Sequence, residues 1–102
     1  MNDKVAQIKI KQQRRQLLTN MDLFYPSPVQ CSTLYRTVIH IDPSYESAAY
    51  RKDVYYLEAK GYFEFVDDQL GGANTFESKV IKLTALGLEI AQRIMTDPAL
   101  EI

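Results

Sequence analysis

Several features that define whole classes of protein are scarce in this chain of 102 residues. The single cysteine, Cys31, excludes an internal disulfide framework and is expected to be a small buried residue. No apolar run approaches the roughly 18 residues that a membrane-spanning helix needs. The first residues also lack the apolar core of a secretory signal. The sequence therefore predicts a cytoplasmic protein without a membrane segment.

Patterns that would indicate catalysis are also scarce. The one histidine, His40, falls at the opposite end of a predicted helix from Cys31, which is a poor layout for a thiolate–imidazole pair. The glycine pair at 71–72 lacks the following Lys-Ser/Thr of a phosphate-binding loop. A turn explains the acidic pair at 67–68 better than a metal site does. We therefore expect no catalytic, metal or cofactor site, and we expect that the protein is not an enzyme.

The net charge of −1 differs from the strongly basic balance of a typical nucleic-acid binder, but the charge is unevenly distributed. Residues 1–18 carry five cations and one acid, so the rest of the chain is acidic. This segment is either a solvated helix face or a helix that faces phosphates. In a dimer it could flank DNA or pair with its symmetry mate. Its candidate DNA contacts are Lys11, Arg14 and Arg15.

Hydrophobic periodicity and turn residues predict one domain, residues 1–96, followed by a loose tail, residues 97–102. Helices are expected over residues 3–24, 27–41 and 44–60. The second would begin with Ser27 as N-cap and Pro28 at the first helical position, and Gly61 suits a left-handed C-cap for the third. Strands over 62–66 and 79–83 would flank a turn region, and Thr84 would cap a last helix.

Apolar residues at helical spacing predict which helix faces are buried. The expected core positions are Ile10, Leu17, Leu18, Met21 and Phe24 in the first helix, Tyr50, Val54 and Leu57 in the third, and Leu88, Ala91, Ile94 and Met95 in the last. Val5 and Ile8 begin a separate stripe that could serve a partner subunit. A homodimer is expected because so short a chain buries a limited core.

Two segments resemble the winged helix-turn-helix superfamily of bacterial and phage regulators. Residues 53–62 (DVYYLEAKGY) are similar to the end of a recognition helix that runs into the first wing strand. Residues 81–87 (IKLTALG) are similar to the L-T-x-x-G corner between the second wing strand and the last helix. The resemblance implies an α+β winged-helix fold, in the order helix, helix, helix, strand, wing, strand, helix.

Within that superfamily the chain resembles the broad group of MarR-, PadR- and ArsR-type regulators, and also small winged-helix proteins of Mu-like prophages. It departs from the ArsR type because one Cys and one His cannot form a paired Cys/His metal site. It departs from the MarR type, whose terminal dimerisation helices are usually longer, because one N-terminal helix and a short last helix must serve here.

The resemblance makes the third helix the candidate reader of a DNA major groove. A helical wheel places on its outer face the small, hydroxyl and cationic residues Ser44, Tyr45, Ala48, Arg51, Lys52, Tyr55 and Ala59. The acids Glu46, Asp53 and Glu58 are expected on the flanks or towards the core. Arg51 could pair with guanine or phosphate, and Lys52 with phosphate. The alternative is an ordinary solvated helix face.

The predicted wing has few residues that could contact DNA. Its tip has no Arg or Lys, so only Asn74, Thr75 and Lys79 could reach a phosphate, and a weak contact or none is expected. Together these patterns predict a small, sequence-specific, dimeric transcriptional regulator that binds double-stranded DNA. The alternative is a winged-helix protein-interaction module without DNA binding, for which a phage origin is one interpretation. The net acidity and the seven tyrosines favour this alternative.

Overall fold

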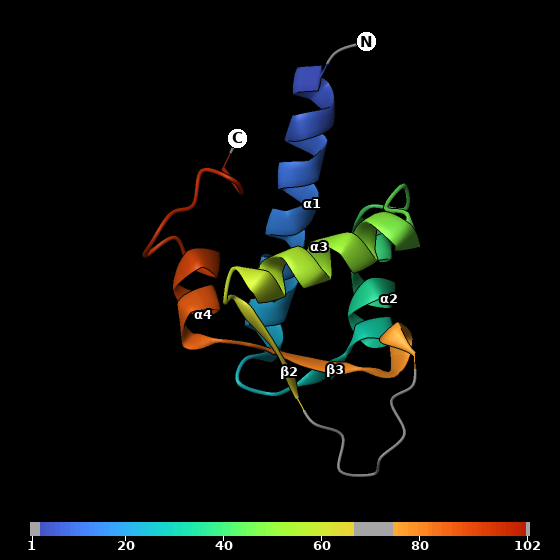
Figure 1. The fold of residues 1–102 in the computed structure, drawn as a ribbon, viewed down its shortest axis with the longest axis vertical. Coiled ribbons are helices and arrows are strands. Elements are labelled where there is room, and N and C mark those ends of the chain that lie inside the picture. The colour runs from blue at the N-terminus through green and yellow to red at the C-terminus, as the bar shows by residue number, and fades with distance from the viewer. Residues whose placement is uncertain (1–2, 67–74, 102) are drawn as a thin grey trace.

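The computed structural model describes residues 3–66 and 75–101, and in them an α+β protein (Figure 1). Its helices are α1 (Asp3–Phe24), α2 (Cys31–Ile41), α3 (Ser47–Ala59) and α4 (Ala85–Ala91). Its strands are β1 (Val29–Gln30), β2 (Phe63–Val66) and β3 (Val80–Leu83), and a short 3-10 helix, η1 (Phe76–Ser78), precedes β3. The α+β class is confirmed. Residues 67–74, which include most of the expected wing tip, lie outside the described residues.

The three strands form one antiparallel sheet in the order β1-β3-β2. Phe65 pairs with Ile81 on one side of β3, and Val29 pairs with the same residue on the other side. The predicted start of the second helix at Ser27 and Pro28 was therefore wrong, because the chain after them is extended along β3. The helix begins only at Cys31, whose amide donates to the Lys79 carbonyl (2.9 Å).

The third helix also begins later than the sequence indicated. Ser44 and Tyr45 lie in the turn before it, where the Asp42 carboxylate accepts hydrogen bonds from the Ser44 amide (3.1 Å) and hydroxyl (2.5 Å). Such a bond from an aspartate to the backbone two residues on stabilises a turn in place of a helix. The first helical residue is Ser47.

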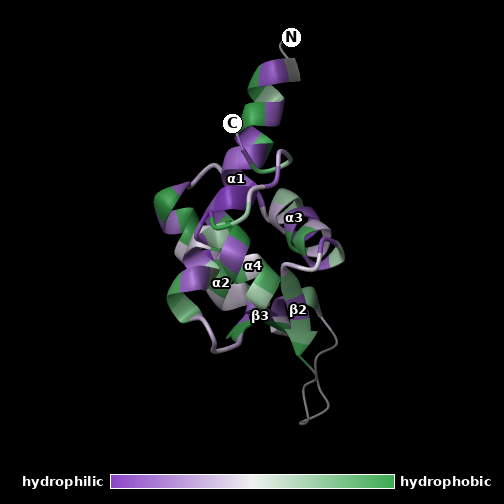
Figure 2. Cartoon of the chain, turned by 90° about the vertical axis from the view of Figure 1, so that its left-hand side faces the viewer, coloured by the Kyte–Doolittle hydropathy of each residue, from purple (hydrophilic) through white to green (hydrophobic). Residues whose placement is uncertain are grey.

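The core lies between the helices and the inner face of the sheet. Its fully buried aliphatic residues include Leu17, Leu18 and Met21 of α1, Leu34 and Val38 of α2, and Val54 and Leu57 of α3. The first part of α1 rises beyond this core and carries mixed hydrophilic and hydrophobic residues (Figure 2). Ile10 lies on that part and is 41% exposed, so its expected place in the core was wrong.

A close backbone approach connects α4 to the start of β2. The Thr84 side chain accepts from the Gly87 amide (3.0 Å), so the predicted cap is confirmed, and its hydroxyl donates to the Gly61 carbonyl (2.6 Å). A Cβ on Gly87 would lie 2.2 Å from the Tyr62 carbonyl oxygen, so only glycine fits there. Gly61 has a φ of 84°, as expected for a left-handed C-cap.

The chain beyond α4 differs from the sequence-based expectation in two ways. The helix ends at Ala91, so Ile94 and Met95 lie past it and are exposed rather than inward-facing. Residues 97–101 are packed against the body, in contrast to the loose tail that was expected: Asp97 and Leu100 are both buried. Ile102 lies outside the described residues. No helix in the described part of the chain is long and apolar enough to cross a membrane.

Candidate nucleic-acid interface

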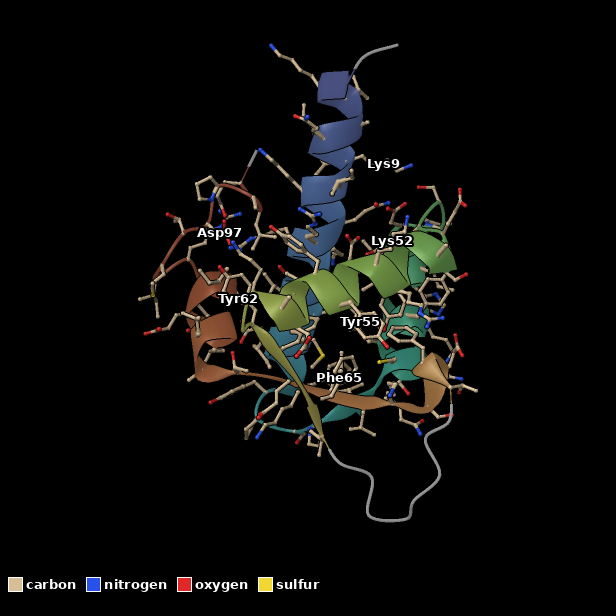
Figure 3. The ribbon with its side chains drawn as sticks, in the orientation of Figure 1. Lys9, Lys52, Tyr55, Tyr62, Phe65 and Asp97 are labelled. Carbon is tan, nitrogen blue, oxygen red and sulfur yellow. The ribbon has the colours of Figure 1, made fainter. Side chains whose placement is uncertain are left out.

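One long side of α3 faces away from the core. Tyr50, Asp53, Val54 and Leu57 point inward, and their spacing of three and four residues is that of one helical face. The opposite side exposes Ala48, Arg51, Lys52, Tyr55 and Ala59, which are the α3 residues that the sequence singled out. Figure 3 shows Lys52 and Tyr55 on α3 where it crosses in front of α1.

Arg51 is held by aromatic rings. Its guanidinium carbon lies 5.5 Å from the centroid of the Phe76 ring and 6.0 Å from that of Tyr55, within the range of cation–π attraction. Among residues 3–66 and 75–101, no carboxylate forms an ion pair with it. Its planar set of donors is therefore available to an outside acceptor.

The rings beside Arg51 belong to a group of three, Tyr55, Phe65 and Phe76, here called the aromatic cluster. The Tyr55 centroid lies 5.4 Å from that of Phe65 and 5.6 Å from that of Phe76. The Lys79 ammonium lies 5.7 Å from the Phe65 centroid, on the hairpin side of the cluster. Sequence reasoning missed Phe65, although the alternation of residues 62–66 already placed it on the same strand face as Phe63.

Tyr45 is the clearest error among the predicted contact residues. It is 1% exposed, and its hydroxyl donates to the Asp53 carboxylate (2.6 Å) inside the protein. Its backbone carbonyl accepts from the Tyr35 hydroxyl (2.7 Å). Tyr45 therefore cannot contact DNA in this conformation. Ser44 is exposed, but it lies in the turn before α3 rather than on the reading helix.

The exposed side of α3 also carries an acid. Glu58 is exposed at the C-terminal turn of the helix, so the expectation of a face without carboxylates was wrong. Asp53, in contrast, is buried as expected. Burial raises the pKa of Asp53 and outweighs the hydrogen bonds from Tyr45 and Arg14, which act in the opposite direction.

Arg14 and Arg15, two of the cations of the basic segment, are used within the protein. The Arg14 Nε lies 3.3 Å from the Asp53 carboxylate, and its guanidinium stacks 3.7 Å above the Tyr56 ring. Arg15 donates to the carbonyls of Ile90 (2.7 Å) and Ala91 (3.2 Å) at the end of α4. Arg14 thus lies against α3 and lines the groove between α1 and α3, but its charge is already paired, and Arg15 is used at α4. Lys11 is half-exposed.

A groove separates α1 from the first half of α3, and a lysine stands on each side of it. Lys9 of α1 and Lys52 of α3 both line this groove, with Ile10, Ala49 and Tyr56 among the other lining residues. Figure 3 shows both lysines on the same side of the molecule. Neither forms an ion pair with a described carboxylate. The sequence analysis did not select Lys9, because a linear charge count does not show which helix face meets α3.

The hairpin residues that the sequence named are only partly described. Asn74 lies outside the described residues. Thr75 is exposed, but its hydroxyl oxygen accepts from the Ser78 amide (3.3 Å) and so caps η1. Lys79 is half-buried beside Phe65. Of the two described residues, Lys79 lies beside the aromatic cluster, through its contact with Phe65.

Burial raises the pKa of the Cys31 thiol to about 12, so this thiol stays protonated at neutral pH. Within the described ranges, no group of three or more His, Cys, Asp or Glu side chains is arranged to hold a metal ion.

Comparison with known proteins finds no matching family model, no matching curated protein and no matching solved structure.

Proposed function

We propose that this protein is a winged helix-turn-helix DNA-binding protein that reads double-stranded DNA with α3, in the role of a transcriptional regulator. The observation that carries the proposal is Arg51, which is exposed on α3, forms no ion pair with a carboxylate of residues 3–66 or 75–101, and has its guanidinium held by two aromatic rings. Arginine in this state is suited to the O6 and N7 acceptors of guanine in a major groove.

The surroundings of α3 support the same function. α2, the turn at 42–46 and α3 follow one another as in a helix-turn-helix, and an antiparallel pair of strands, β2 and β3, follows α3. A duplex lying on α3 would also pass the groove between α1 and α3. Lys9 and Lys52 would then contact backbone phosphates, which position a protein on DNA without reading its sequence.

We also propose that the protein acts as a homodimer. Val5 is 61% exposed and Ile8 is 40% exposed on the part of α1 that rises beyond the core. Burying such residues against a second copy would add apolar area that this small chain lacks. A dimer would present two α3 helices to two half-sites of one DNA target.

The test is a titration of purified protein into labelled duplex fragments from around its own gene, with competitor DNA, at low and near-physiological salt. We expect saturable binding whose affinity falls as salt rises, because phosphate contacts release counterions. Arg51→Ala should weaken specific binding by about 1–3 kcal/mol. Lys82→Ala is the matched control, since Lys82 pairs with Glu64 (3.4 Å) on the outer face of the sheet. Arg51→Ala binding as tightly as wild type would disprove the role of α3.

A second candidate function is a winged-helix interaction module that binds a protein instead of DNA. The aromatic cluster favours it, because Tyr55 is 37% exposed and aromatic side chains are common anchors of protein interfaces. The argument from tyrosine content becomes weaker, however, since Tyr45, Tyr50 and Tyr62 are all buried. An absence of duplex binding even at low salt would favour this second function.

A further inference from the structure

The aromatic cluster is apolar and partly exposed, and it lies directly beside the cation proposed to read a base. Arg51 and Tyr55 are four residues apart on α3, so their Cα atoms are separated by about 6 Å along the helix axis. Successive base pairs are about 3.4 Å apart along a duplex. Two neighbouring side chains with this spacing would reach bases that are one or two steps apart.

We propose that Arg51 and the aromatic cluster together recognise a guanine and the 5-methyl group of a thymine within two base steps of it. This inference rests on the proposed function and specifies the DNA feature that the α3 surface selects. In the major groove, guanine presents two acceptors to arginine, and thymine alone among the four bases presents a methyl group. An apolar surface beside an arginine is complementary to that pair of features.

Two cations lie beside the cluster and favour duplex DNA as its occupant, with Glu58 exposed on the next turn of α3 beyond Tyr55. Arg51 flanks the cluster on the α3 side and Lys79 flanks it on the hairpin side, each within 6.0 Å of one of its rings. Neither cation has an ion-pair partner in the described part of the chain. A base edge against Tyr55 would therefore have a cation on each side, with phosphates of the same duplex within their reach.

The packing of the cluster favours a methyl group over a stacked base. Tyr55 is tilted by 47° against Phe65 and by 39° against Phe76, and the Arg51 guanidinium lies near the same ring. These neighbours restrict the access of an unpaired base to the Tyr55 ring, on which a single strand would have to stack. The part of Tyr55 that stays exposed is suited to a contact as small as one methyl group.

The experiment measures the affinity of the protein for its selected duplex, obtained from a random library, with each thymine in turn replaced by uracil. Uracil keeps the base pair and the phosphate and removes only the methyl group. We expect one position, within two steps of a guanine, at which uracil weakens binding about fourfold, the effect of one buried methyl group. Replacing that guanine by 7-deazaguanine should also weaken binding, because it removes the N7 acceptor.

The protein variants connect the effect to Tyr55. Tyr55→Ala should bind the thymine and uracil duplexes equally while keeping the salt dependence of wild type, and Tyr55→Phe should still discriminate because the ring remains. Tyr25→Ala, at a tyrosine that is similarly exposed (39%) but outside the cluster, should behave like wild type. Thermal unfolding of each variant establishes that it is folded.

Several outcomes would overturn the inference, and they separate it from the proposed function. If Arg51→Ala weakens binding but uracil is tolerated at every position, α3 reads DNA and the cluster serves only to pack α3 against the hairpin. A preference for single-stranded DNA over duplex would also overturn it. If no duplex is bound at any salt concentration, both the inference and the proposed function fail.

Discussion

Arg14 shows how the environment of one residue changes what its charge can do. It is one of five cations in the basic segment, yet its guanidinium lies between the buried Asp53 carboxylate and the Tyr56 ring. A cation in this position stabilises the fold, because without it Asp53 would be a buried charge with one hydroxyl as its remaining hydrogen-bond donor.

Arg14→Ala should therefore destabilise the protein rather than act on DNA binding alone. We expect a loss of about 1–3 kcal/mol in the free energy of unfolding, below the range for a fully buried pair because Arg14 retains some exposure. Urea denaturation measures it. Lys11→Ala is the control and should leave the stability unchanged within about 0.5 kcal/mol. Equal stability of Arg14→Ala and wild type would show that the ion pair contributes nothing.

Asp97 is a second residue whose charge is used inside the protein, and its effect depends on pH. Burial alone would raise its pKa, but hydrogen bonds from Lys60, Tyr62 and the Ala99 amide outweigh burial and lower the pKa to about 2. The unfolded chain then binds a proton at a higher pH than the folded chain does. The stabilisation by Asp97 is fully present above the pKa that an aspartate has in the unfolded chain, about 4. It is lost as the pH falls towards 2, the pKa of Asp97 in the folded protein.

Asp97→Asn should remove this pH-dependent stabilisation, which is about 2 kcal/mol for the shift involved. Wild type should lose stability between about pH 5 and pH 2, and the variant should lose less over the same range because it has no carboxylate to protonate there. Chemical denaturation at a series of pH values gives the comparison. Parallel curves for the two proteins would show that Asp97 is not the group responsible.

At the scale of elements, the junction between β2 and α4 is the feature most dependent on residue type. Gly87→Ala would place a methyl group against the Tyr62 backbone, which cannot move without disturbing the end of α3 and the start of β2. We expect a destabilisation of more than about 3 kcal/mol, or failure to fold. Circular dichroism and thermal unfolding measure it. The control is Ala85→Gly, at the first position of the same helix, where a loss of about 1 kcal/mol or less is expected. A stable Gly87→Ala variant would contradict the close approach.

The same junction shows what the sequence could predict about the fold. The Thr84 cap is local, since the Gly87 amide that it accepts from lies within one turn, and it was predicted correctly. The approach of Gly87 to Tyr62 joins distant parts of the chain and was not predicted. β1 was missed because its pairing with β3 involves residues about fifty positions away, and a good cap signal at Ser27 and Pro28 competed with it. Non-local pairing of this kind leaves no signal in a two-residue strand.

In the candidate site, too, the residues fixed by local periodicity were predicted, and those that depend on non-local packing were not. Arg51, Lys52 and Tyr55 were found because helical periodicity alone separates the exposed side of α3 from the buried side. Tyr45 was assigned wrongly because the helix was extended through a turn that the Asp42 side chain closes. Lys9 and Phe65 were missed because their place beside α3 depends on how α1 and β2 pack against it.

At the scale of the whole molecule, the two sides of the groove between α1 and α3 should contribute equally to electrostatic attraction for DNA. Lys9→Ala and Lys52→Ala should each weaken binding of specific and random duplexes alike, and each should reduce the slope of log affinity against log salt by about 1. Binding isotherms at several salt concentrations test this, with Lys82→Ala as control. An unchanged slope for Lys9→Ala would show that α1 does not approach the duplex.

The connection at Tyr62 also determines how this molecule can change shape. Its amide donates to Leu57 of α3 (2.9 Å), and its carbonyl accepts from the Thr84 amide (3.0 Å) at the start of α4. The end of α3, β2 and the start of α4 are thus joined through main-chain hydrogen bonds. α1 is attached to them through side chains such as Arg14 and Arg15. We therefore expect a motion that adapts the protein to a bound ligand to widen or close the groove between α1 and α3, whose two sides are joined by side chains, rather than to separate α3 from β2.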